Sequence, residues 1–102
     1  MNVLEIYAVY DKKVGVHMTP FFVRSEGEAR RVFLDIFMNE EHSLTRHAGD
    51  YDLYYIGTFE ENSGNISRDT VCQIWTGLEA RKVALQAKRS ENHAQRDDPS
   101  LQ

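Results

Sequence analysis

Several features that often indicate a function are scarce or missing in this sequence. Cys72 is the single cysteine, so an internal disulfide is impossible and a reducing compartment is expected. No apolar run is long enough for a transmembrane helix, and the first residues lack the basic and apolar segments of a signal peptide. The glycine-rich motifs that bind phosphate groups are missing as well. We therefore expect a small intracellular domain with no membrane partner.

Positive charge is also scarce over most of the chain. The net charge is −4, and residues 1–78 hold seven Lys or Arg against twelve Asp or Glu. Such a chain does not bind nucleic acid through bulk positive charge. Residues 79–89 differ, because they hold four basic residues against one glutamate. Any attraction to a polyanion is therefore expected to be local.

Candidate catalytic and metal-binding groups do not form convincing sets. Cys72 lies between Val71 and Ile74, where a packed and inert thiol is expected. His42 and His47 are five residues apart with no cysteine nearby, which is poor spacing for a metal site. We therefore expect no enzymatic activity, no metal and no cofactor.

The clearest element of the sequence is a helix over residues 25–38. Ser25 and Glu28 have the spacing of a capping box, in which each side chain accepts the other residue's amide. Five apolar residues then recur with helical spacing: Ala29, Val32, Phe33, Ile36 and Phe37. This pattern predicts a helix that buries one face.

Four β-strands are expected around this helix. They cover residues 3–10, 16–24, 53–59 and 71–76. Pro20 has no amide hydrogen, so the second strand is predicted to lie at an edge of the sheet or to be broken by a bulge. The fourth segment also fits helical spacing, so both a strand and the beginning of a longer helix remain open there.

The predicted fold class is α+β, with a small antiparallel sheet, the order β-β-α-β-β, and one helix packed on a face. Residues 1–77 form this domain, and residues 39–52 within it are a polar connection without strong periodicity. Residues 78–90 form a basic helical segment. Residues 91–102 are polar and poor in large apolar residues, which predicts a disordered tail.

The sheet face away from the helix is the first candidate binding surface. Strand alternation places Tyr7, Phe22 and Tyr54 side by side there, with Arg24 next to Phe22. Such rings can stack on unpaired bases while a nearby cation holds the backbone. The alternatives are a core beneath the second helix and an interface between copies of the chain. Both faces of the first strand are apolar, so we expect a homo-oligomer.

Exposed basic residues provide the second candidate surface. They are Lys12 and Lys13 at the tip of the first hairpin, and Arg81, Lys82, Lys88 and Arg89 in the basic segment. A basic helix binds polyanions through counterion release. The alternative for the basic segment is an ordinary solvated helix face, with cations near the negative end of the helix dipole.

A set of residues over roughly 4–66 resembles a known family. The set consists of IYAV at Ile6 followed by Asp11, Gly15, Pro20-Phe21, Ser25-Glu26-Gly27 with Ala29 and Phe33, and Tyr51-Asp52-Leu53-Tyr54 leading to Gly57. It resembles the small nonstructural protein of gokushovirus-type microviruses, phages with circular single-stranded DNA genomes. The resemblance implies a DNA-binding phage protein acting in the bacterial host cytoplasm, in single-stranded DNA synthesis or the switch to packaging. It carries no catalytic residues over to this chain.

Two hypotheses follow for the function. The first is a non-enzymatic protein that binds single-stranded DNA through the aromatic and basic residues named above. The second is a protein-interaction module that modulates a viral or host replication protein without touching DNA. The acidic body and the apolar second face of the sheet favour the second hypothesis.

Overall fold

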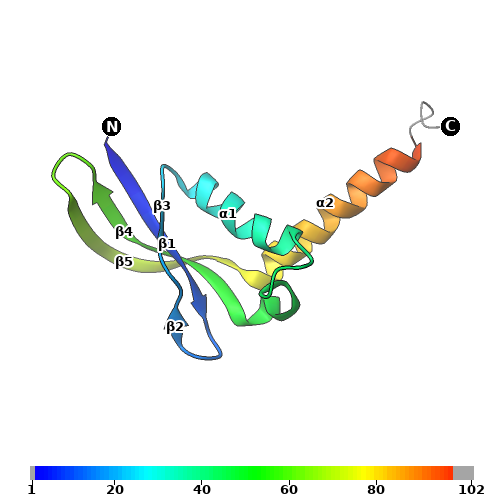
Figure 1. Ribbon diagram of the computed structural model, residues 1–102, viewed down its shortest axis with the longest axis horizontal. Helices are drawn as coiled ribbons and strands as arrows, with labels where there is room; N and C mark the ends of the chain where they lie inside the picture. Colours follow the sequence, from blue (N-terminus) through cyan, green and yellow to red (C-terminus); the bar gives the residue numbers. More distant parts are fainter. Residues whose placement is uncertain (1, 98–102) are drawn as a thin grey trace.

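The computed structural model describes residues 2–97, and the side chains of residues 2–89. Its elements are, in chain order, β1 (Val3–Asp11), β2 (Val16–His17), β3 (Phe21–Val23), α1 (Glu26–Met38), the 3₁₀ helix η1 (Thr45–Asp50), β4 (Tyr51–Glu60), β5 (Asn65–Thr76) and α2 (Gly77–Asp97). The predicted α+β class is confirmed, with one sheet and helices beside it (Figure 1).

All paired strands of the sheet run antiparallel, in the order β2-β1-β4-β5. β3 also pairs with β1, so β2 and β3 together replace the single strand predicted over residues 16–24. The interruption falls at Met18 to Pro20, where the proline cannot donate to a strand ladder. The structure therefore places the proline at a break along this edge of the sheet, as predicted.

Residues 71–76, for which the sequence allows both a strand and a helix, form part of a strand. β5 begins at Asn65, earlier than predicted, and continues to Thr76. A capping box then starts α2: Thr76 Oγ1 accepts the Glu79 amide at 3.1 Å, and Glu79 Oε1 accepts the Thr76 amide at 3.4 Å. These two bonds satisfy amides at the beginning of the helix and mark the change from strand to helix.

Two segments differ from their predicted form. The connection 39–52 contains η1, and the Thr45 hydroxyl there donates to the carbonyl oxygens of Ile36 and Asn39 at 2.9 and 2.7 Å. α2 continues to Asp97, beyond the predicted end of the basic segment. Within the predicted disordered tail, residues 91–97 are helical, and residues 98–102 lie outside the described residues.

No helix in the described part of the chain is both long and apolar enough to cross a membrane.

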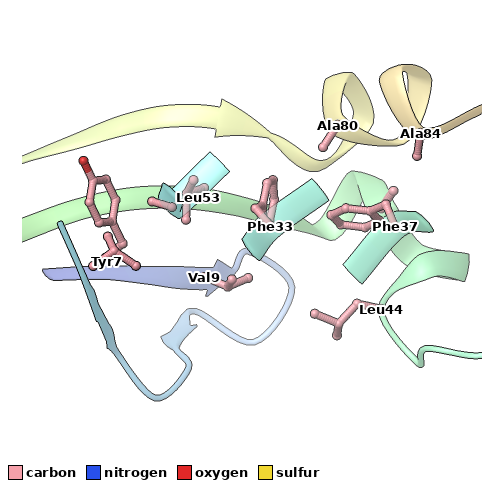
Figure 2. Packing of buried hydrophobic residues seen from close by; sticks show 11 residues of the cluster. Tyr7, Val9, Phe33, Phe37, Leu44, Leu53, Ala80 and Ala84 are labelled. Carbon is pink, nitrogen blue, oxygen red and sulfur yellow. The ribbon is translucent and has the colours of Figure 1, made fainter. Parts of the chain in front are cut away.

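The core lies between α1 and one face of the sheet (Figure 2). Ser25 Oγ accepts the Glu28 amide at 3.3 Å as predicted, whereas the Glu28 carboxylate accepts the Arg24 amide at 2.9 Å rather than that of Ser25. Phe33 and Phe37 are fully buried, with ring centroids 5.0 Å apart in an edge-to-face arrangement. The prediction for Val32 is wrong, because its side chain is 42% exposed.

The first turns of α2 pack on the same core. Ala80 and Ala84 are fully buried, and small side chains of this kind let two helices approach closely. Figure 2 places both alanines on the side of α2 that faces the core, and Figure 1 shows α2 projecting away from the sheet. Within the described residues, α1 and α2 therefore pack against each other and against one face of the sheet, and they leave the other face uncovered.

Candidate nucleic-acid interface

The residues of β1 alternate between two faces of the sheet. On the side covered by α1, Tyr7 pairs with Tyr55, and Val9 pairs with Leu53. We call the opposite side the open face. It consists of Leu4, Ile6, Ala8 and Tyr10 of β1, together with His17, Phe22, Tyr54 and Phe59 from the strands paired with it.

The predicted position of Tyr7 is wrong. Its side chain is 2% exposed beneath α1, and its ring centroid lies 6.3 Å from that of Phe21 and 5.5 Å from that of Tyr55. The Tyr7 hydroxyl donates to Glu5 Oε1 at 2.7 Å. Burial, followed by this bond and the Glu5 charge, raises the pKa of Tyr7 above its ordinary value. Both faces of β1 are apolar in sequence, so alternation alone does not tell which face the helix covers.

Phe22 and Tyr54 do lie on the open face, as predicted, but not side by side. Phe22 is opposite Ile6 on one side of β1, and Tyr54 is opposite Ala8 on the other side. Each ring therefore belongs to a cluster of its own. Phe22 packs edge-on against Phe59 with centroids 5.5 Å apart, and Tyr54 packs edge-on against Tyr10 at 5.7 Å.

Sequence reasoning missed three rings of the open face: Tyr10, His17 and Phe59. Tyr10 shares its strand parity with Ala8, so it could have been found once the covered face was known. Plain alternation places Phe59 on the wrong face, because a β-bulge reverses the alternation of β4. Tyr7 pairs with Tyr55 and Ile6 with Gly57, which leaves Ile56 as the extra residue.

Gly57 marks this bulge in the sequence. A Cβ atom at that position would lie 2.1 Å from the carbonyl oxygen of Ser67, so only glycine allows β5 to approach so closely. A glycine inside an otherwise apolar strand is a recognised signal for a bulge. The signal was present in the sequence, and it indicates that residues on its two sides follow different alternation.

The rings form a thin layer over β1. Ile6 and Ala8 point to the open face and are only 4% and 1% exposed, although no described helix covers them. Phe22, by contrast, is 44% exposed. The aromatic side chains thus shield the smaller residues of β1 while part of their own surface remains accessible.

Cations lie at both ends of the open face. Lys12 Nζ is 3.3 Å from the buried Asp52 carboxylate, and Arg24 pairs with Glu61 at 2.9 Å. Lys13 is exposed in the β1–β2 turn. Arg68 is exposed, and its register opposite Gly57 places it on the open face. Lys12 and Arg24 therefore belong to the site but already have carboxylate partners.

The basic segment is divided between two roles. Arg81 donates to the Phe37 carbonyl at 2.8 Å and to Glu40 Oε1 at 2.8 Å, and Lys88 donates to Glu40 Oε2 at 3.1 Å. These bonds lower the pKa of Glu40. Arg81 and Lys88 thus help to hold α2 against the end of α1, while Lys82 and Arg89 are exposed. The segment presents less available positive charge than its composition suggests.

The remaining candidate groups carry little chemistry. Cys72 is exposed, which contradicts the prediction of a packed thiol, because it lies on the edge strand β5. Among the described residues, no group of three or more histidine, cysteine, aspartate or glutamate side chains could hold a metal ion. The aromatic open face is therefore the most distinctive surface of the molecule.

Comparison with known families gives one result. The family described as "Phage ORF5 protein" matches residues 4–80. No curated protein and no solved structure matches the chain significantly. The matched region includes the sheet except for Val3, together with α1 and the beginning of α2. Because the match covers most of the sequence, this protein belongs to the phage ORF5 protein family.

Proposed function

We propose that this protein is a non-enzymatic phage protein that binds single-stranded DNA through the open face of its sheet. The observation that carries the proposal is the layer of five aromatic rings on a face without a described helix: Tyr10, His17, Phe22, Tyr54 and Phe59. Resemblance to microvirus nonstructural proteins supports a role in genome replication or in the switch to packaging. The proposed place of action is the cytoplasm of the bacterial host.

Stacking is expected to provide most of the affinity. A base stacked on an aromatic side chain contributes about 1–3 kcal/mol and does not depend strongly on sequence. The cations of the open face are few, and two of them already form ion pairs. Neutralising about three phosphates gives a logarithmic salt slope of about −2 for single strands. The proposal therefore predicts weak salt dependence for a DNA-binding protein.

The test is fluorescence anisotropy with a labelled oligothymidylate and the full chain, at about 50 mM and about 200 mM salt. Truncation before α2 is unsuitable, because Ala80 and Ala84 are buried in the core. The exposed cations of the basic segment are tested instead by the double substitution Lys82→Glu and Arg89→Glu. The open face is tested by Tyr54→Ala.

We expect Tyr54→Ala to weaken binding about tenfold and the double substitution to weaken it less. If the double substitution abolishes binding and Tyr54→Ala has no effect, the site lies on α2 and not on the sheet. Absence of binding at about 50 mM salt by the folded full chain would refute DNA binding altogether.

A protein-interaction module that modulates a viral or host replication protein is the second candidate. The observation in its favour is the paired state of the cations: Lys12, Arg24, Arg30, Arg81 and Lys88 all have a carboxylate partner. An apolar face on an acidic protein also suits a protein partner. A folded chain that fails to bind DNA but binds a phage or host replication protein through Phe22 and Tyr54 would support this candidate.

Self-association stays a prediction. β5 forms one edge of the sheet and is twelve residues long. Such an edge can pair with another chain, and the open face can pack against a second copy. Light scattering on the full chain across a range of protein concentrations tests the prediction directly. A strict monomer at all concentrations would contradict it.

A further inference from the structure

The ring cluster at one end of the open face borders a shallow hollow of about 260 Å³ that is open to solvent. Its walls are Tyr10 of β1, His17 of β2, Tyr54 of β4 and Val71 of β5. The centroid of the Tyr10 ring lies 4.6 Å from that of His17 and 5.7 Å from that of Tyr54, and the latter two are 6.1 Å apart. The ring planes are inclined to one another by 50° to 79°. Three strands thus supply aromatic walls with different orientations.

The position of this hollow follows from the fold. The register sets His17 opposite Tyr10, and Tyr54 opposite Ala8. Ala8 lies between them on β1, has a small side chain and is only 1% exposed. Gly15 has a φ of +78°, which suits glycine, in the turn that returns β2 to β1. Regular pairing therefore brings the rings together, and β2 can be located beside β1 in Figure 1.

We propose that this hollow is a subsite for one unstacked nucleobase of a bound single strand, an inference that rests on the proposed function. Its volume lies below the range of about 300–1,000 Å³ that is typical of sites for drug-sized ligands. A single planar ring system suits this size, whereas a longer ligand does not. Aromatic walls bind such a ring system through stacking and edge-to-face contacts, whatever the base.

Positive charge beside the hollow suits the phosphate of the same nucleotide. Lys12 and Lys13 come after Asp11, two and three residues beyond Tyr10, and the Lys12 side chain is 44% exposed. The Asp11 carboxylate accepts the Lys13 and Val14 amides at 3.0 and 3.3 Å. The Asp52 carboxylate, which pairs with Lys12, also accepts Gln73 Nε2 at 2.8 Å and the Gly77 amide at 3.4 Å. Lys12 therefore stays paired with the buried carboxylate, and Lys13, which has no carboxylate partner among the described residues, is the cation of the turn that is available to a phosphate.

This subsite is separate from the second ring pair of the open face. Phe22 packs on Phe59 opposite Ile6, whereas the hollow lies at the Tyr10 end of β1. Ile6 and Tyr10 are about 13 Å apart, given a rise of about 3.3 Å per residue in a strand. The two places can therefore hold different bases of one strand, and substitutions can affect them separately.

A cationic ligand is the competing occupant, because aromatic rings set at steep angles also bind quaternary ammonium groups. The charges near the hollow argue against it. Lys12 balances the negative charge of Asp52, the Asp11 carboxylate is turned to the Lys13 and Val14 amides, and Lys13 is an exposed cation of the same turn. A cation entering the hollow would approach this basic turn, whereas a nucleotide phosphate would be attracted to it.

The first experiment is an NMR titration of the full chain with thymidine 5′-monophosphate, and separately with tetramethylammonium chloride. Thymidine monophosphate is expected to shift the ring signals of Tyr10, His17 and Tyr54 in a saturable manner. Tetramethylammonium is expected to leave them unchanged. Shifts with tetramethylammonium alone would overturn the proposal in favour of a cation site.

The second experiment measures oligothymidylate affinity for two variants of the hollow. His17→Ala removes an exposed wall, and Val71→Phe fills the space without removing any ring. We expect each to weaken binding about tenfold. His47→Ala is the matched control, because His47 is an exposed histidine in η1 and is expected to change the affinity by less than about twofold.

These variants also separate the two proposals. If the wild-type chain binds single-stranded DNA and both folded variants bind it equally well, the subsite is refuted while DNA binding stands. If the wild-type chain does not bind DNA, the proposed function fails, and the subsite fails with it. Circular dichroism melts establish that the variants are folded, and His17→Ala alone decides the matter if Val71→Phe fails to fold.

Discussion

The two faces of β1 are buried to a similar degree but by different means. On the side under α1, Tyr7 is 2% exposed and is covered by a helix that carries Phe33 and Phe37. On the open face, Ile6 is 4% exposed and is covered by rings that are themselves accessible, such as Phe22. Low exposure of a strand residue therefore does not reveal what covers it. A helix keeps the strand beneath it from contact with a partner, whereas a layer of partly exposed rings is itself a surface that can bind a partner.

The largest predicted effect concerns the stability of these two layers. Phe33→Ala should lower the free energy of unfolding by about 3–5 kcal/mol, because it leaves a cavity in a fully buried position. Phe22→Ala should lower it by less than about 1.5 kcal/mol, because that ring is 44% exposed. Urea unfolding of both variants measures the difference. Equal losses would show that the open face is as much a core as the side under α1.

DNA affinity should show the opposite order. Phe22→Ala should weaken binding of oligothymidylate about tenfold, because it removes a stacking ring. Leu85→Ala on α2 is a matched control, since Leu85 is also 44% exposed but carries no ring. Anisotropy titrations at about 50 mM salt compare the two variants. An equal loss of affinity in both would indicate that general apolar surface, and not stacking, drives binding.

A smaller effect is expected from the Tyr7 hydroxyl. Tyr7→Phe should cost about 1.5 kcal/mol at neutral pH, because it leaves Glu5 without its buried donor. The raised pKa of Tyr7 means that the folded state retains its proton to higher pH than the unfolded state. Wild-type stability should therefore fall as the pH rises above about 10, the ordinary tyrosine value.

Tyr7→Phe should make this alkaline decline shallower. Melting temperatures at about pH 7, 9 and 11 measure it. Tyr55→Phe is the comparison, because burial and the hydrogen bond to Asp69 at 3.2 Å raise the pKa of Tyr55 as well, and it should make the decline shallower to a smaller extent. A decline as steep in Tyr7→Phe as in the wild type would contradict the assignment to Tyr7.

The smallest effect is expected at Glu40, which joins the two helices through Arg81 and Lys88. Glu40→Gln should lower the melting temperature slightly at pH 7, since exposed ion pairs contribute little. Because the pKa of Glu40 is lowered, its contribution is present above the unfolded value and is lost as the pH falls through the folded value. The difference in melting temperature between the variant and the wild type should therefore shrink as the pH falls below the ordinary glutamate pKa of about 4.3. Glu41→Gln, at an exposed neighbouring position on the same loop, is the matched control.

Elements with strong local signals could be predicted from the sequence. The Ser25 cap and the spacing of Ala29, Phe33 and Phe37 were sufficient for α1, because local hydrogen bonds and periodicity determine a helix. Pro20 predicts the break at the sheet edge from a local property too, because it has no amide hydrogen to donate. For residues 71–76 the sequence pattern fits both a strand and a helix, although the capping-box spacing of Thr76 and Glu79 marks where a helix begins.

The site was harder to predict because it depends on long-range pairing. Tyr7 was assigned to the wrong face, since nothing local in β1 says which side α1 covers. Phe59 was missed because the bulge at Ile56 changes the alternation of β4, and the bulge forms against β1 and β5. The predicted faces of Phe22 and Tyr54 are correct because the pairing of each residue with β1 is regular.

The bulge in β4 also affects how this protein can change over time. If Ile56 were kept but paired regularly with β1, Phe59 would fall on the side under α1 and Thr58 on the open face. Deleting Ile56, by contrast, would leave Phe59 opposite Leu4 on the open face. The bulge therefore determines which face this phenylalanine serves, and changes that abolish the bulge without shortening β4 are the events by which relatives could lose this part of the aromatic surface.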